Sequence, residues 1–202
     1  MVKIVEPITR GWSDDKKYKV MDEAGVSYLL RISDANRYEH RKTLFKMMQR
    51  AEALDIPMCK PIEFGTNDEG VYSLQSWING KDLEDVLPSI SETEQYALGV
   101  KSGKILKQIH SIPAPADQED WAVRFNRKVD SKINRYLEHW YKFDGDTYLI
   151  DYINNNRTLL DNRPQCFHHG DYHTGNMMLS DSGELTITDF DRYDFGDPMG
   201  RI

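Results

Sequence analysis

The residues best suited to chemistry lie close together near the C-terminal end of the chain. Half of the six histidines and a dense set of acidic residues fall there. Gly170 and Gly175 disfavour a helix, so Asp171 and Asn176 are expected on a loop. Asp189 follows a predicted hairpin that begins just after Asn176. Because a hairpin brings its two ends together, the Asn176 and Asp189 side chains are expected to face one shared point.

One interpretation of these polar residues is that Asp and Asn beside glycines simply form turns. It suits Asp181 and Asp194, which stand in turn-like sequence. It is less suited to Asp171, Asn176 and Asp189 together. If these residues only formed turns, two separate loops would have placed potential oxygen ligands at the ends of one hairpin independently of each other.

A second interpretation is a zinc site. His169 and His173 form an H-x-x-x-H pair, which binds zinc well when both side chains lie on one face of a helix. The neighbouring glycines argue against a helix, and no third ligand stands at a convincing spacing. The sequence therefore disfavours zinc.

The third interpretation is phosphoryl transfer. This reaction needs an aspartate near the acceptor hydroxyl, a metal ion held by Asn and Asp, and a cation on the nucleotide phosphates. Asp171, Asn176 and Asp189 can fill the first two roles in that chain order. Their oxygens suit Mg²⁺, which keeps waters and substrate phosphates as its other ligands. We therefore favour a Mg²⁺-dependent kinase.

The elements that must position this segment begin with two β-hairpins. Alternating apolar residues and turn residues predict strands over 18–21 and 26–32, and again over 62–65 and 71–75. Between the hairpins, apolar residues at helical spacing predict a helix that begins near Asp34.

After Gly80 the pattern changes from strands to helices. Ser91 and Glu94 make an S-x-x-E capping box at the start of one helix. Apolar residues at helical spacing predict two more amphipathic helices, over 125–140 and 149–160.

These patterns predict an α+β chain in two parts. Residues 1–80 would form a small antiparallel sheet with one helix. Residues 81–202 would form a mainly helical part that also carries the late hairpin, with strands over 177–179 and 185–188.

Composition and charge restrict the function further. The 202 residues include 26 Lys and Arg against 33 Asp and Glu, a formal charge of −7. A negative balance argues against nucleic acid as a partner and is compatible with a cationic small molecule. No apolar stretch approaches the ~20 residues of a membrane span, and the start lacks a secretory signal. Cys59 and Cys166 are far apart in sequence, which fits the reduced cytoplasm better than a disulfide framework.

The late motif resembles that of the aminoglycoside phosphotransferase family. The resemblance rests on H-G-D at 169–171, on Asn176 five residues later, and on I-T-D-F-D at 187–191. The family consists of small-molecule kinases with a protein-kinase-like bilobal fold, and the wider group includes choline and macrolide kinases. The likeness covers most of the chain and is most specific in this late segment.

The resemblance implies a role for each residue of the motif. Asp171 would be the catalytic base, and His169 would brace it. Asn176 and Asp189 would hold Mg²⁺. ATP or GTP would be the phosphoryl donor.

The first part of the chain fits the same family with less specific signals. Gly11 and Ser13 lie in a polar loop between predicted strands, where the family has a phosphate-covering loop. Arg31 stands where protein kinases have a lysine, and its guanidinium can bind phosphate oxygens with two parallel hydrogen bonds. Glu39 is expected to pair with Arg31. Alternatively, the loop of Gly11 and Ser13 is an ordinary polar turn, and Arg31 and Glu39 are solvent-exposed charges.

Gln75, Trp77 and Ile78 fall in a segment that resembles the linker between the two lobes. In the family the backbone of this linker would contact the adenine ring, so the identity of its side chains carries little information. Trp77 is expected to pack rather than to stack on the base.

The resemblance implies transfer of the γ-phosphoryl group to a hydroxyl group of an aminoglycoside. The alternatives are another acceptor, such as choline, a sugar or a macrolide, and a nucleotide-binding fragment without turnover. The last alternative arises because, in this family, further helices follow the position of Pro198 and complete the acceptor pocket. The sequence therefore predicts a C-terminally truncated member, whose acceptor site a second copy of the chain could complete.

Overall fold

The computed structural model describes residues 3–9 and 14–199 of the chain. Strands and helices are both present, so the fold is α+β as predicted. Within the described ranges, no helix combines the length and the apolar character needed to cross a membrane.

The chain forms two compact units, and each is built from two separate stretches of sequence. The first unit comprises Met1–Ile112 with His169–Tyr193, and the second comprises Pro113–His168 with Asp194–Ile202. This division differs from the boundary expected near Gly80, for a reason that lies in the late hairpin.

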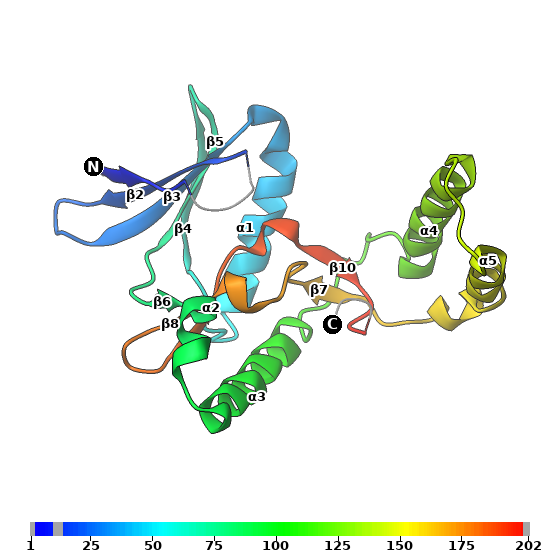
Figure 1. Cartoon of the computed structure of the whole chain (residues 1–202). Helices are drawn as coiled ribbons and strands as arrows, with labels where there is room; N and C mark the ends of the chain where they lie inside the picture. Colours follow the sequence, from blue (N-terminus) through cyan, green and yellow to red (C-terminus); the bar gives the residue numbers. More distant parts are fainter. Residues whose placement is uncertain (1–2, 10–13, 200–202) are drawn as a thin grey trace. The chain divides into compact units, whose positions relative to one another are not determined.

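A five-stranded antiparallel sheet dominates the N-terminal part of the first unit (Figure 1). Its strands, in spatial order, are β1 (Lys3–Pro7), β2 (Lys16–Met21), β3 (Ser27–Ser33), β5 (Gly70–Ser76) and β4 (Pro61–Asn67). Both predicted hairpins are confirmed, because β2 pairs with β3 and β4 pairs with β5. In the first turn the Asp22 carboxylate accepts hydrogen bonds from the amides of Ala24 (3.0 Å) and Val26 (2.8 Å).

Helix α1 (Tyr38–Glu52) packs on β4 and β5 of this sheet. It continues from a short 3₁₀ turn, η1 (Ala35–Arg37), whose first residues are capped by Asp34. The helix predicted between the two hairpins is thus confirmed, together with its cap. Leu44 and Met48 lie on its buried face, and burial of these apolar side chains holds the helix against the sheet.

A three-stranded sheet carries the late hairpin. Its strands, in spatial order, are β6 (Lys81–Asp82), β8 (Met177–Leu179) and β9 (Leu185–Ile187). Ile187 also bonds to the segment after α1, since its amide donates to the Pro57 carbonyl (2.9 Å) and its carbonyl accepts from the Cys59 amide (3.3 Å). The late hairpin therefore belongs to the same unit as the N-terminal sheet. The residues after Gly80 join this unit as well, because β6 pairs with β8 and because helices that follow β6 contact the late hairpin.

The first unit also contains several helices. They are α2 (Leu83–Val86), η2 (Leu87–Ser89), α3 (Glu92–Ile109), η4 (Thr174–Asn176) and η5 (Phe190–Arg192). The predicted capping box at the start of α3 is confirmed. The Ser91 hydroxyl accepts from the Glu94 amide, and the Glu94 carboxylate accepts from the Ser91 amide.

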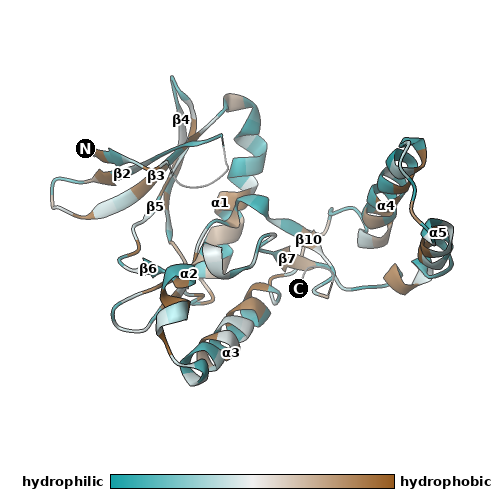
Figure 2. Cartoon of the chain, viewed as in Figure 1, coloured by the Kyte–Doolittle hydropathy of each residue, from teal (hydrophilic) through white to brown (hydrophobic). Residues whose placement is uncertain are grey.

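The second unit is mainly helical. Its elements are α4 (Trp121–Glu138), α5 (Asp146–Asn155), η3 (Arg157–Leu160) and the antiparallel pair β7 (Cys166–His168) and β10 (Asp194–Gly196). Hydrophilic and hydrophobic residues both occur along α4 (Figure 2), and its buried residues are Trp121 and Ala122 at its start. The Asp120 carboxylate accepts from the Val123 amide and so caps α4.

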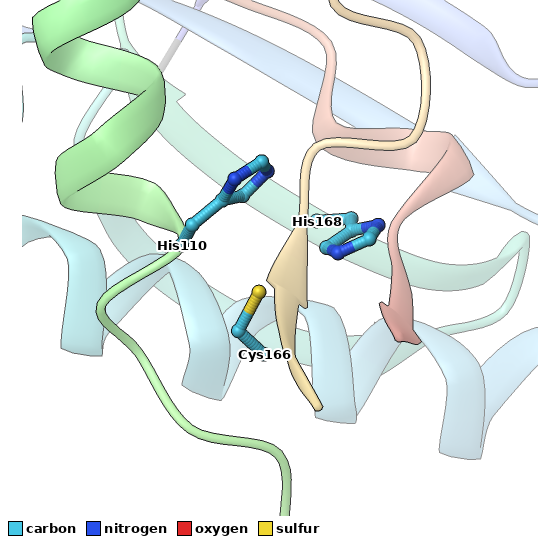
Figure 3. A group of neighbouring side chains, drawn as sticks. All are labelled: His110, Cys166 and His168. Atoms are coloured by element: carbon cyan, nitrogen blue, oxygen red, sulfur yellow. The ribbon is translucent and has the colours of Figure 1, made fainter. Parts of the chain in front are cut away.

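The pair β7 and β10 was not predicted, because three residues are too few for an alternating pattern to show. Cys166 and His168 lie at the two ends of β7 (Figure 3), and both side chains are buried. Burial raises the pKa of the Cys166 thiol to about 11. Both cysteines of the chain are free and buried.

Candidate active site

The first unit contains a cavity of about 1000 Å³. Residues predicted for nucleotide, metal and proton chemistry line it, namely Arg31, Gln75, Trp77, Ile78, Asp171, Asn176 and Asp189. They come from β3, from β5 and the segment after it, and from the loops on either side of the late hairpin. The fold therefore gathers residues from distant parts of the sequence around one space.

Gly170 permits the loop that carries the predicted base. Its φ of 84° lies in the left-handed region that favours glycine. A Cβ atom at this position would overlap the carbonyl oxygen of Arg192 and lie 3.0 Å from the amide nitrogen of Tyr193. The absence of a side chain thus allows the loop to lie directly against the backbone that follows Asp189.

His169 connects the two loops of the site. Its Nε2 lies 2.7 Å from the Thr188 carbonyl oxygen, to which it donates, and its Nδ1 accepts from the Asp171 amide at 3.3 Å. The ring packs against Phe190, with 4.5 Å between ring centroids. Burial lowers the pKa of His169, which favours the neutral imidazole that these two bonds require. Because both ring nitrogens are engaged, the imidazole is not available as a zinc ligand.

The Asp171 carboxylate opens into the cavity. Its side chain is 35% exposed, and its Oδ2 lies 3.6 Å from Nη1 of Arg192 and 3.7 Å from Nε2 of His173. A partly exposed carboxylate, fixed through its own backbone amide, can accept a proton from a molecule in the cavity.

Asn176 and Asp189 lie on backbone segments that are bonded to each other. The Thr188 amide donates to the Asn176 carbonyl (2.9 Å), and Nδ2 of Asn176 donates to the Asp171 carbonyl (2.9 Å). Since the nitrogen of the amide group is engaged in this bond, the oxygen Oδ1 is the atom that Asn176 can offer to a cation.

Asp189 has a strained backbone and a half-exposed side chain. Its φ of 58° is left-handed, which is uncommon for a residue other than glycine and is concentrated at functional sites. Burial by itself would raise the pKa of Asp189, but the neighbouring Arg31 guanidinium holds it below the usual value. A carboxylate and an amide oxygen form the donor set that Mg²⁺ prefers, so Asn176 and Asp189 fit this ion.

Arg31 is buried on β3 among three carboxylates. Its Nε lies 2.5 Å from Oδ2 of Asp15, its Nη1 lies 2.9 Å from Oδ1 of Asp189, and its Nη2 lies 3.0 Å from Oδ2 of Asp191. Glu39, the partner expected for Arg31, is exposed in the first turn of α1. The carboxylates that pair with Arg31 therefore come from the residue before β2 and from the segment after the late hairpin.

Three predicted nucleotide-contacting residues lie at the end of β5 or directly after it. Gln75 is buried in the sheet opposite Leu29 of β3. Trp77 and Ile78 follow β5, and the Lys19 ammonium group lies 4.7 Å from the centre of the Trp77 ring. Two further predicted residues, Gly11 and Ser13, lie outside the described residues.

Sequence reasoning missed four charged residues beside Arg31. They are Asp15, Arg37, Arg41 and Asp191. A signal was present for two of them, because Arg37 and Arg41 are four residues apart and such residues share a helix face. Asp191 belongs to the I-T-D-F-D motif but was given no role, and Asp15 carried no recognisable signal.

Known proteins with related sequence or structure identify the chain's family and fold. The family model described as the phosphotransferase enzyme family matches residues 4–199. A comparison with curated protein sequences found no match.

Solved structures of aminoglycoside phosphotransferases have the same fold. The streptomycin–ATP ternary complex of APH(2")-IIa is similar with a TM-score of 0.67 and 19% identity, over 97% of this chain and 68% of that chain. ADP-bound APH(2'')-Ib gives a TM-score of 0.67 and 19% identity, over 97% and 69%. APH(3'')-Id from Streptomyces rimosus gives a TM-score of 0.60 and 16% identity, over 96% and 73%.

These likenesses confirm the protein-kinase-like fold predicted from the late motif. At such low identities the structural matches establish the fold alone, whereas the family model spans nearly the whole described chain. On that ground the chain belongs to the phosphotransferase enzyme family.

Proposed function

We propose that this chain is a kinase that transfers the γ-phosphoryl group of ATP or GTP to a hydroxyl group of an aminoglycoside. Membership of the phosphotransferase enzyme family supports phosphoryl transfer. Proteins of the same fold were solved with ATP, ADP, streptomycin and gentamicin. The observation that carries the proposal is that Arg31, Asp171, Asn176 and Asp189 line one cavity within one unit.

In the proposed reaction Asp171 orients the acceptor hydroxyl and accepts its proton. The bond between the γ-phosphorus and its bridging oxygen breaks, the acceptor oxygen bonds to that phosphorus, and the nucleoside diphosphate leaves. His169 fixes the Asp171 backbone through the hydrogen bond at Nδ1, which keeps the carboxylate in place without taking part in proton transfer.

Asn176 and Asp189 would hold Mg²⁺, which supplies positive charge to the phosphate oxygens when it is bound. Arg31 would add a second cation. Its guanidinium can exchange one of its three carboxylate contacts for a phosphate oxygen, because both groups accept the same pair of hydrogen bonds. The backbone of Gln75, Trp77 and Ile78 would contact the base.

The charge around the cavity supports a cationic acceptor. Six carboxylates line the cavity against four cationic side chains; the carboxylates are those of Asp14, Asp82, Glu84, Asp171, Asp189 and Asp191, and the cations are Lys17, Arg31, Arg37 and Arg192. The whole chain carries a formal charge of −7. Carboxylates of this kind attract amines at a distance, and added salt weakens the attraction.

The test is turnover with ATP or GTP against a panel of acceptors. The panel contains streptomycin, gentamicin and, as a metabolic alcohol, choline, and the readout is nucleoside diphosphate released together with the mass of the phosphorylated product. Asp171→Ala should abolish turnover and leave nucleotide binding in place. The matched control is Asp181→Asn, a change at an exposed carboxylate in the turn between β8 and β9. Near-normal turnover in Asp171→Ala would contradict the proposed base, and phosphorylation of choline alone would contradict the acceptor class.

A further inference from the structure

Six charged residues form a compact cluster beside the cavity. We call it the arginine–aspartate cluster, and its members are Arg31, Arg37, Arg41, Asp15, Asp189 and Asp191. Three positive and three negative charges balance each other, and all six belong to the first unit. The residues come from β3, from η1 and α1, from the position before β2, and from the segment after β9.

Asp191 is the member that joins this last segment to η1 and α1. Its Oδ1 lies 3.4 Å from Nη2 of Arg37 and also accepts from Nη1 of Arg41, while its Oδ2 lies 3.0 Å from Nη2 of Arg31. Its backbone carbonyl lies 3.2 Å from Nε2 of His40. A side chain with only 13% exposure thus makes three charged contacts, which together fix its position.

Neighbouring contacts strengthen the same connection. The Tyr193 ring stacks on His40 with 4.8 Å between centroids, and its hydroxyl donates to the His40 carbonyl. Arg41 also donates to the Ser33 hydroxyl at 2.8 Å, which ties α1 to the end of β3. The segment after Asp189 is therefore attached to α1 by charged, polar and ring contacts.

Asp191 also divides the charge of Arg31. The guanidinium contacts Asp15, Asp189 and Asp191 at once. If Asp191 lost its charge, the same guanidinium would be balanced by Asp15 and Asp189 alone. The surroundings of the Asp189 carboxylate would then carry more net positive charge, so a divalent cation would bind to this carboxylate less well.

We propose that Asp191 is a positioning residue that anchors α1 to the loop of Asp189 and keeps the Asp189 carboxylate available for a divalent cation. The proposal rests on the proposed function, in which Asp189 is a metal ligand. Asp191 pairs with Arg31, as the acidic residue Glu39 on the helix was expected to do. Here η1 and α1 contribute arginines to the cluster, and the acidic residue comes from the segment after β9.

The test compares nucleotide binding with and without magnesium. Calorimetry on the full chain would give the dissociation constant of adenylyl imidodiphosphate in Mg²⁺ and in EDTA, and the ratio of the two values measures the gain from the metal. In Asp191→Asn the surplus positive charge should leave metal-free binding equal or tighter, while the gain from Mg²⁺ falls about tenfold. A purely structural defect would weaken both. Asp191→Glu, which restores the charge, should recover most of the gain, and Asp181→Asn should leave it unchanged.

Hydrogen exchange provides a readout that needs no ligand. Amides of α1 should exchange faster in nucleotide-free Asp191→Asn than in the unmodified chain or in Asp181→Asn. If Asp191→Asn does not fold, Arg37→Gln removes one of its partners at a side chain that is 34% exposed. It should speed exchange in α1 more weakly, and the gain from Mg²⁺ should not fall, because a cation and not a carboxylate has been removed.

The outcomes separate the two proposals. An unchanged magnesium ratio together with unchanged exchange in α1 would overturn the role of Asp191. An unmodified chain that binds no nucleotide would overturn the proposed function, and the exchange of α1 would still decide whether Asp191 anchors the helix.

Discussion

Gly170→Ala should greatly slow phosphoryl transfer although it adds only one methyl group. Gly170 has a φ of 84°, and a Cβ atom there would overlap the carbonyl oxygen of Arg192. The neighbouring atoms are backbone atoms, which cannot rotate away as a side chain could. The loop and the segment after Asp189 would therefore have to separate by on the order of 1 Å to restore van der Waals contact.

The magnitude follows from what this separation does to Asp171. Asp171 is the next residue, so a shift of the loop moves its carboxylate relative to Asn176 and Asp189. A misplacement of about 1 Å costs roughly a hundredfold in rate when the reacting groups must be aligned. The left-handed backbone adds about 1–2 kcal/mol of destabilisation for a residue with a Cβ atom.

Gly183→Ala is the matched control. Gly183 has a φ of 78°, close to that of Gly170, but nothing lies within 4 Å of a Cβ atom built there. It should therefore show the backbone destabilisation without the steric overlap. Phosphoryl transfer, nucleotide affinity and thermal unfolding would be measured for both variants. Equal turnover in Gly170→Ala and Gly183→Ala would refute the reasoning that close backbone approach fixes the position of Asp171.

Three further predictions concern the stability and reactivity of the first unit. Ser91→Ala removes the hydroxyl of the capping box and should destabilise the fold by about 1 kcal/mol, measured by urea unfolding, whereas an unchanged midpoint would contradict a role for the cap. Burial raises the pKa of the Cys59 thiol to about 12, so iodoacetamide at neutral pH should modify it only after unfolding; rapid labelling of the native chain would show otherwise. Burial by itself would raise the pKa of Asp15, but Arg31 and Arg41 hold this pKa below its usual value. The Asp15 carboxylate therefore stabilises the fold above about pH 4, and this stabilisation is lost as the pH falls through the folded-state pKa. The stability of Asp15→Asn should depend less on pH below about pH 4, and parallel curves for the two proteins would argue against this ion pairing.

The sequence predicted the elements that depend on residues close together along the chain. The two hairpins of the N-terminal sheet and the cap at Ser91 depend on residues a few positions apart, and the structure contains them all. The pairing of Arg31 depends instead on the tertiary structure, because Asp191 is distant in sequence. A helix propensity cannot indicate that Glu39 points to solvent while Arg41 points inward.

The residues around the cavity were predicted for a different reason. Asp171, Asn176 and Asp189 stand in a motif whose glycines and spacing limit what the backbone can do, so the sequence alone indicated a shared point for their side chains. The extent of each unit could not be read in this way. The late hairpin joins the first unit through the pairing of β6 with β8 and through the hydrogen bonds of Ile187 with Pro57 and Cys59, and backbone contacts of this kind leave no pattern in the side chains.

The bonds of Ile187 also have a consequence for the order of folding. Met58 and Ile187 form a parallel bridge although most of the chain separates them in sequence. During synthesis the backbone groups of the segment after α1 that bond to Ile187 are solvated until the late hairpin has left the ribosome. Contacts of such high sequence separation are slow to form because a long loop must close first. We therefore expect the first unit to reach its native state only after Ile187 has been made, with the helices of the second unit already free to form.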